Sequence, residues 1–305
     1  MPNAVKGILY ACITAILWGV LAIVLKVSLN ELTPADITWC RFFLAFVVLS
    51  AYYLVKKPYY LRILRRPPWL LILATLCLAI NYYGFIEGVN LTTPSIAQVF
   101  IQLGPVLLAI SGFVFFGEKV NWRQIVGFLL VIAGLIVFYR EQIQRIVSEK
   151  GTWQTGIIWV LIAAVSWAAY SVILKLLVLK HPPMQLNLVI FGLPALLYLP
   201  FVNFQHFAHI GISGWLILVF LGLNTLFAYG LLSLAIHYVE ANKISVILVL
   251  NPILTFAIMA IISHTQATWI KHEHYTPVTL IGAVIVLVGA ILTIIRKNRT
   301  IKSME

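Results

Sequence analysis

Stretches without charged residues are the feature of this sequence that most restricts how the chain can fold. The longest runs from His181 to Val239 without any Asp, Glu, Lys or Arg, and others cover 7–25, 67–86, 91–117, 151–174 and 275–295. A helix crosses the roughly 30 Å hydrocarbon core of a bilayer with about 20 apolar residues, and about 18 already suggest a span. Every stretch reaches that length, and the longest could hold two spans. The sequence therefore predicts an all-α polytopic membrane protein.

The composition supports the same class of protein. Hydrophobic residues make up 62% of the 305 residues and charged residues 10%, whereas soluble domains carry about 45–50% and about 25%. The connections between apolar stretches are short, which leaves no room for a soluble catalytic domain. The three cysteines, Cys12, Cys40 and Cys77, lie inside apolar stretches and are interpreted as small hydrophobic residues.

Charges, prolines and polar clusters divide the chain into ten predicted membrane-spanning helices. They cover approximately residues 6–28, 35–55, 69–89, 93–117, 121–140, 155–179, 183–202, 214–238, 242–263 and 275–295. With the N-terminus inside, fifteen of the 21 Lys and Arg flank the spans on the cytoplasmic side, five lie opposite, and Arg41 lies within a span. Because positive loops face the cytoplasm, we expect both termini there, in a bacterial cytoplasmic (inner) membrane. The net charge of +12 then reflects topology and attraction to anionic lipid, not nucleic-acid binding.

The first and sixth predicted spans repeat one another. The segments 7-GILYACITAILWGVLAIVLK-26 and 156-GIIWVLIAAVSWAAYSVILK-175 share seven of twenty positions at a constant offset of 149 residues. Further matches follow in the same order: Tyr83-Gly84 with Tyr229-Gly230, Pro105 with Pro252, and Gly127 and Gly134 with Gly282 and Gly289. The sequence therefore predicts two five-helix repeats, residues 1–146 and 147–305.

An odd number of spans in each repeat has a geometric consequence. The second repeat must cross the membrane in the opposite direction, so a pseudo-two-fold axis in the membrane plane relates the two halves. Inverted repeats favour alternating access, with the solute bound near the midplane between the halves. A channel is the alternative interpretation, and the repeat favours a carrier.

The segment 93-TPSIAQVFIQLGPVLLAISGFVFFGEKVNWRQIVGFLLVIAGLIVF-138 and the paired first spans resemble the drug/metabolite transporter superfamily, specifically its EamA-type members. The similarity rests on Pro105, on Gly117-Glu118-Lys119 and on Gly127 and Gly134, and it covers essentially the whole chain. The second half has 263-SHTQ-266 where Gly-Glu is usual. The resemblance implies ten helices, a central cavity between the halves, and export of amino acids, other metabolites or drugs.

Polar and aromatic residues at membrane depth are the candidates for lining that cavity. Gln98, Gln102 and Pro105 share one helix face, and Pro105, like Pro252, is expected to kink its helix and free a carbonyl. Asn and Tyr side chains suit a neutral or zwitterionic solute because they both donate and accept hydrogen bonds. The candidates are Trp18, Asn81, Tyr82, Gln98, Gln102, Trp167, Tyr170, Asn224, Tyr229 and Asn251. The alternative is that these side chains only pack the core and bond helices together.

Three titratable residues are candidates for gating or coupling. Arg41 and Glu87 are predicted to lie at similar depth near the outer side of the membrane, where they could form a structural ion pair or a gate. Alternatively, Arg41 could bind a substrate carboxylate or extend to the outer lipid headgroups. His237 could couple transport to protons, or merely cap a helix.

Several other functions are disfavoured by the residues that the sequence contains. Adjacent His272-Glu273-His274 lacks the i, i+4 spacing of a helical zinc site, so we expect no metal, and no cofactor motif occurs. Hydrolase motifs are missing as well, so we expect no enzyme. The leading hypothesis is a secondary-active exporter of neutral or aromatic amino acids, with protons as a candidate coupling ion, and the alternative is a multidrug exporter. A monomer and a homodimer fit the glycine-rich spans equally well.

Overall fold

A computed structural model describes residues 3–117, 122–148, 151–265, 270 and 276–294. Regular structure within these residues is entirely helical. The first half contains α1 (Asn3–Ser28), α2 (Pro34–Lys56), the 3-10 helix η1 (Pro58–Leu64), α3 (Trp69–Leu91), α4 (Pro94–Phe100), α5 (Leu103–Phe116) and α6 (Trp122–Ser148). The second half contains α7 (Thr152–Leu177), α8 (Pro183–Tyr198), the 3-10 helix η2 (Leu199–Phe201), α9 (Phe204–His209), α10 (Ile212–Tyr238), α11 (Ala241–Leu248), α12 (Asn251–His264) and α13 (Pro277–Ile294).

Eight helical segments in the described part of the chain are long and apolar enough to cross a membrane. They are Asn3–Ser28, Pro34–Lys56, Trp69–Leu91, Pro94–Phe116, Thr152–Leu177, Pro183–Phe201, Ile212–Tyr238 and Lys243–His264. This confirms the prediction of an all-helical polytopic membrane protein. The two other predicted spans, 121–140 and 275–295, coincide with α6 and α13, of which α6 carries a shorter apolar stretch, Ile125–Val137. The count of ten spans stays a prediction.

Two of the spans are interrupted at matching places. The fourth predicted span divides into α4 and α5 around Ile101 and Gln102, and the ninth divides into α11 and α12 around Val249 and Leu250. Pro105, which follows the first break, has no N–H to bond the carbonyl four residues earlier. That carbonyl, of Ile101, instead accepts a hydrogen bond from the Gly104 N–H at 2.9 Å. The expected kink at the proline is thus an interruption that begins before the proline.

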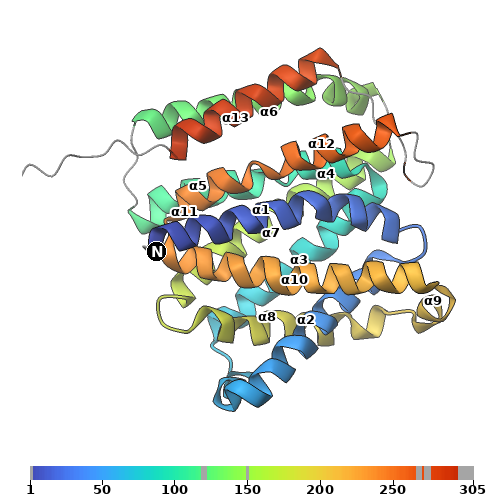
Figure 1. The fold of residues 1–305 in the computed structure, drawn as a ribbon, viewed down its shortest axis with the longest axis vertical. Helices are drawn as coiled ribbons and strands as arrows, with labels where there is room; N and C mark the ends of the chain where they lie inside the picture. The colour runs from blue at the N-terminus through green and yellow to red at the C-terminus, as the bar shows by residue number, and fades with distance from the viewer. Residues whose placement is uncertain (1–2, 118–121, 149–150, 266–269, 271–275, 295–305) are drawn as a thin grey trace, which may run out of the picture.

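Helices of the two halves pack against each other in a reciprocal pattern. The first helix of each half packs against the third spanning helix of the other, since α1 contacts α10 and α3 contacts α7. Counterparts also meet directly: α2 contacts α8, and α6 contacts α13. In Figure 1 the pair α6 and α13 forms one edge of the helix bundle and α2 with α8 the opposite edge. The interrupted helices and the α1, α3, α7 and α10 group lie between these edges.

Glycines allow the close contact between α6 and α13. A Cβ atom added at Gly289 would lie 2.7 Å from the Gly127 carbonyl oxygen, and one added at Gly134 would lie 2.7 Å from the Val286 nitrogen. Any side chain at these positions would therefore separate the two backbones. The glycine matches found in the sequence, at Gly127, Gly134, Gly282 and Gly289, serve packing within the chain.

Candidate functional site

A cavity of about 60 Å³ lies between the two halves, near the helix interruptions. Its lining comes from α1, α2, α3, α4, α5, α7, α10 and α12: Trp18, Leu21, Arg41, Asn81, Tyr82, Phe85, Gln98, Ile101, Gln102, Pro105, Trp167, Tyr229 and Asn251. Irregular backbone at membrane depth is tolerated where it is buried in protein or lines a cavity. The break between α4 and α5 meets that condition, because both of its residues line the cavity. A space of this size holds only a few water molecules.

The cavity unites most of the side chains selected from the sequence. Eight of the ten cavity candidates line it: Trp18, Asn81, Tyr82, Gln98, Gln102, Trp167, Tyr229 and Asn251. Arg41 and Pro105 line it as well, whereas Pro252 does not. Tyr170 and Asn224 lie just outside: the Tyr170 ring is 6.1 Å from the Tyr229 ring, and Asn224 donates to the Leu17 carbonyl at 2.9 Å.

Aromatic rings form one wall of the cavity. The Trp18 ring lies 6.0 Å from Trp167 in an edge-to-face arrangement and 5.2 Å from Tyr229. Tyr82 lies 5.4 Å from Tyr229 and continues the wall towards Arg41. Such spacing is typical of interacting aromatic pairs, which also leave a flat apolar surface exposed to a ligand.

Amide side chains hold the surrounding helices in place. The Gln98 amide donates to the Trp18 carbonyl at 2.9 Å, and the Asn81 amide donates to the Ala163 carbonyl at 2.9 Å. The Gln102 amide donates to the Gln98 carbonyl at 3.1 Å. These donors are therefore already used for contacts within and between helices, as the packing interpretation of the sequence predicted.

Other polar atoms in the cavity have no hydrogen-bond partner among the described residues. They include Gln102 Oε1, Trp167 Nε1 and Asn251 Oδ1. Each of these residues lines the cavity and is no more than 5% exposed. A buried polar atom without a partner costs about 1–3 kcal/mol. Their positions consequently favour a cavity that receives water or a polar solute.

Arg41 supplies the cavity with a buried positive charge. Its side chain is 1% exposed, its Nε donates to Thr225 Oγ1 at 3.0 Å, and its guanidinium carbon lies 4.4 Å from the centre of the Tyr82 ring. Ion pairs in the described part of the chain join Lys243 to Glu240 and His206 to Asp36, so none of them neutralises Arg41. A buried charge is costly unless it is paired.

The anticipated pairing of Arg41 with Glu87 does not occur. Glu87 accepts a hydrogen bond from Asn90 at 3.5 Å and is outside the cavity lining. Tyr82, which contacts Arg41, precedes Glu87 by five residues on α3, and this separation turns the two side chains about 140° apart around the helix axis. Glu87 therefore lies on another face of α3 than the one that Tyr82 directs at Arg41.

His237 also lies away from the cavity. Its Nδ1 hydrogen bonds to the Val178 carbonyl at 2.9 Å, where the end of α10 meets the end of α7. This geometry matches the helix-capping interpretation. Glu118, Lys119 and His272-Glu273-His274 lie outside the described residues, and no metal-binding group of His, Cys, Asp or Glu occurs among the residues that are described.

The lysines of the repeated first helices make equivalent contacts. Lys26 Nζ donates to three carbonyls at the C-terminal end of α3, at 2.9 to 3.1 Å. Lys175 Nζ donates to the carbonyls of Ile236 and Val239 at the C-terminal end of α10, at 3.0 and 2.8 Å. The last carbonyls of a helix have no partner within it, and a cation there is favourable. The lysine at the end of each repeated segment therefore joins the first and third spanning helices of its own half.

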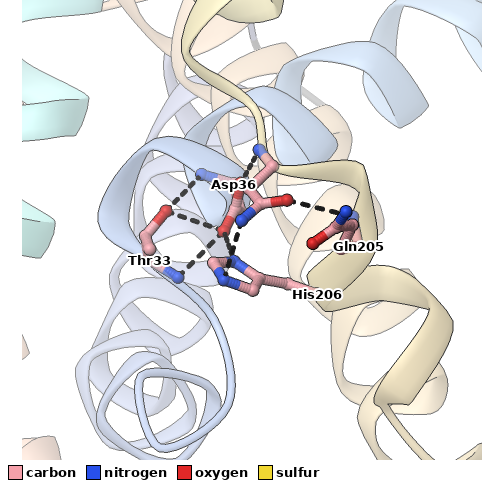
Figure 2. A network of polar contacts seen from close by, with 5 residues as sticks. Thr33, Asp36, Gln205 and His206 are labelled. Carbon is pink, nitrogen blue, oxygen red and sulfur yellow. Dashed lines mark hydrogen bonds and ion pairs between the residues drawn. The ribbon is translucent and has the colours of Figure 1, made fainter.

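A polar network outside the cavity was missed in the sequence. Asp36 Oδ2 accepts hydrogen bonds from Thr33 Oγ1 and pairs with His206 Nδ1, both at 2.7 Å, while Oδ1 accepts one from the Asn203 N–H at 2.9 Å. Figure 2 shows this network, which ties the first turn of α2 to α9. The capping-box pattern of Thr33 and Asp36 was visible in the sequence. Nothing in the pattern indicated His206.

Comparison with known proteins identifies the family to which the chain is similar. The model of the EamA-like transporter family matches residues 5–140 and 154–295. An "Uncharacterized inner membrane transporter YhbE" of Escherichia coli (strain K12) is 30% identical, and the alignment covers 97% of this chain and 96% of that protein. An "Uncharacterized transporter" of Haemophilus influenzae is 29% identical, with 95% and 94% covered.

Two further similarities are more distant. A "Probable amino-acid metabolite efflux pump" of Escherichia coli (strain K12) is 23% identical, with 93% of each chain covered. A solved structure titled "Crystal structure of protein" superposes with a TM-score of 0.73 at 19% identity, over 94% of this chain and 96% of that one. The second similarity concerns the fold alone.

Proposed function

The chain belongs to the EamA-like transporter family, and we propose that this multi-pass membrane transporter exports small metabolites, with neutral or aromatic amino acids as the leading candidates. The observation that carries the proposal is the cavity between the halves, which combines an unneutralised Arg41 with an aromatic wall. A zwitterionic amino acid offers a carboxylate for the guanidinium and a side chain for the rings.

The ends of the interrupted helices favour the same ligand chemistry. Gln102 precedes the first residue of α5, Asn251 is the first residue of α12, and both line the cavity. The N-terminal end of a helix carries partial positive charge, and interrupted helices in transporters direct such ends at anionic substrate groups. Together with Arg41, these two ends make the cavity attractive to a carboxylate. The resemblance to the probable amino-acid metabolite efflux pump supports the same substrate class.

Alternating access between two inverted repeats, residues 1–146 and 147–305, is the mechanism that we propose. Reciprocal packing supports it, because exchanging the halves converts the α1–α10 contact into the α7–α3 contact. The matching interruptions and the matching lysine contacts of Lys26 and Lys175 support it as well. In such an arrangement each half can adopt the conformation of the other, which gives two states of similar energy. The small cavity suits a state in which neither side is widely open.

The proposed orientation places both termini in the cytoplasm of a bacterium, with the chain in the inner membrane. The distribution of Lys and Arg supports the orientation, and the name of the Escherichia coli relative supports the membrane. Protons are the candidate coupling ion. The residues that line the cavity come from both halves of the chain, so a monomer and a homodimer both fit the proposed mechanism.

Multidrug export is the second candidate function. The aromatic wall favours it, since rings accept many flat apolar compounds without specific hydrogen bonds. Arg41 distinguishes the two candidates, because a carboxylate-free drug gains nothing from the guanidinium.

Counterflow in proteoliposomes tests the proposal. Purified protein is reconstituted with an unlabelled amino acid inside, and uptake of the labelled amino acid is followed for a panel of neutral and aromatic amino acids and, separately, for cationic drugs. We expect uptake of at least one aromatic or aliphatic amino acid, and stimulation by an imposed pH gradient if protons are coupled. Uptake of the drugs alone would favour multidrug export over amino-acid export. If neither the amino acids nor the drugs are transported, both proposed functions are refuted.

A further inference from the structure

A second, larger groove lies on the outer surface of the helix bundle, away from the cavity. It measures about 460 Å³, and every residue that lines it is apolar: Trp39, Phe43, Phe46, Leu64, Pro67, Ile72, Val189, Gly192, Leu193, Ala195, Leu196 and Leu199. These residues belong to α2, α8, η2, the start of α3 and the segment around η1. The lining of α8 from Val189 to Leu196 alone covers about 10 Å along the helix axis.

One end of the groove is bordered by exposed positive charges. Leu64 and Pro67 line the groove, and the two residues between them, Arg65 and Arg66, are exposed. The other basic residues of this segment, Lys56, Lys57 and Arg62, are exposed too. No Asp or Glu occurs between Asp36 and Glu87 in the sequence, and none of the five joins an ion pair within the described residues.

The basic segment is held at the groove by direct contacts. η1 packs against α8, and the Gln185 side chain donates to the Tyr60 carbonyl at 3.2 Å. The apolar walls and the positive end thus belong to one continuous surface of the fold. Lys57 Nζ lies 5.3 Å from the Tyr60 ring centre, a cation–π contact within the same segment.

The chemistry of this surface selects its occupant. Apolar walls alone would accept any lipid tail equally well, because tails are as apolar as the side chains that they contact. The positive charges distinguish anionic lipids from other lipids, because each basic residue near the membrane surface attracts anionic headgroups by about 1 kcal/mol. A second copy of this chain would bring five basic residues of its own, and like charges would repel.

We propose that the groove binds an anionic phospholipid, with its phosphate at Arg65 and Arg66 and an acyl chain between α2 and α8. The site is separate from the proposed transport cavity, so its occupancy is measured without any transport assay. On the proposed orientation the lipid belongs to the cytoplasmic leaflet, where anionic lipids are attracted to basic segments.

Native mass spectrometry of the full chain in detergent tests the site with two probes, phosphatidylglycerol and phosphatidylcholine that carry identical acyl chains. We expect tighter retention of phosphatidylglycerol than of phosphatidylcholine. In the double variant Arg65→Gln/Arg66→Gln, the affinity for phosphatidylglycerol should fall by about fivefold for each charge removed. The matched control, Lys6→Gln/Arg123→Gln, removes the same charge outside the groove and should leave retention unchanged. Equal retention by the first variant and wild type would overturn the proposal.

A second pair of variants tests the apolar part. Leu196 lines the groove and is 69% exposed, so Leu196→Trp fills the space without burying a clash. Leu216 on α10 is 66% exposed and lies outside the groove, so Leu216→Trp is the control. We expect lipid retention to fall only in Leu196→Trp. Unchanged lipid retention in Leu196→Trp would overturn the proposal. A wild-type dimer that Leu196→Trp dissociates would overturn it as well, because a second copy of the chain would then cover the groove.

Discussion

The rings of Trp18 and Trp167 meet edge to face, with centroids 6.0 Å apart and planes at 79°, although the residues are 149 positions apart in the sequence. Each occupies the same position of the repeated first helix, one in α1 and the other in α7. The Nε1 of Trp167 has no partner among the described residues and the ring lines the cavity. The pair thus places one aromatic surface and one free donor at the junction of the halves.

Removal of that donor should weaken solute binding. In Trp167→Phe the aromatic contact with Trp18 is retained but the indole N–H is lost. A hydrogen bond contributes about 1 kcal/mol, so we expect the KM for the transported solute to rise about fivefold with little change in thermal stability. Transport kinetics and thermal unfolding in detergent provide the two measurements. An unchanged KM would show that the solute does not use this N–H.

Replacement of Arg41 should separate binding from stability. Arg41→Gln leaves a hydrogen-bonding group near Thr225 but removes a buried charge that no carboxylate neutralises. Transport of a carboxylate-bearing solute should fall by at least about tenfold, since charge-assisted bonds contribute about 1.5–3 kcal/mol, while the midpoint of thermal unfolding should stay or rise.

Glu87→Gln is the matched control for Arg41. Glu87 hydrogen bonds to Asn90 and lies outside the cavity lining, so its replacement should leave binding intact. Loss of binding in both variants would contradict the placement of Arg41 as the site of carboxylate recognition.

The two lysine caps should contribute similar stability. Lys26→Met and Lys175→Met each retain the apolar part of the side chain but leave helix C-terminal carbonyls without a cation. We expect each variant to lose about 1 kcal/mol of unfolding free energy, in the range of helix-end charge effects. Steric-trapping measurements of unfolding in bicelles provide the comparison. A large loss in only one variant would argue against equivalent roles in the two halves.

Gly289 should not tolerate a side chain. A Cβ atom there would meet the Gly127 carbonyl oxygen at 2.7 Å and the Val131 nitrogen at 2.8 Å, both in the rigid backbone of α6. Gly289→Val should therefore separate α6 from α13 and cost about 1–3 kcal/mol. Gly211→Ala is the control, because its Cβ would approach only Ser213 Oγ, at 3.9 Å. The midpoints of thermal unfolding should differ clearly between the two variants.

The junction of α2 and α9 should depend on the carboxylate of Asp36. Asp36→Asn keeps the size of the side chain but cannot accept all the hydrogen bonds from Thr33, Asn203 and His206. Hydrogen bonds to charged groups contribute about 1.5–3 kcal/mol, so we expect a loss of about that size. Hydrogen exchange at 203–209 should increase in the same variant, and unchanged exchange would show that α9 is held by its apolar contacts alone.

The sequence predicts which residues line the cavity better than it predicts which residues contact one another. The spacing of Gln98, Gln102 and Pro105 predicts one shared helix face, and all three line the cavity although the helix is interrupted between Gln98 and Pro105. The side of a helix on which a residue lies depends only on the local spacing of residues, so it can be predicted from the sequence. The sequence offers Glu87 as one possible partner of Arg41, because depth can be estimated from position along a helix. The rotation of α3 relative to α2 cannot be estimated in this way, and it brings Tyr82 to Arg41 instead.

What the sequence determined by itself is the class of the protein, the places of most helices and the internal repetition. These follow from hydrophobicity, length and spacing, which are properties of neighbouring residues in an apolar solvent. The tertiary structure decided which distant side chains meet, as Arg41 meets Thr225 and Asp36 meets His206 across more than 160 residues. Such contacts depend on the relative rotation and depth of packed helices, and no single helix encodes these in its own sequence.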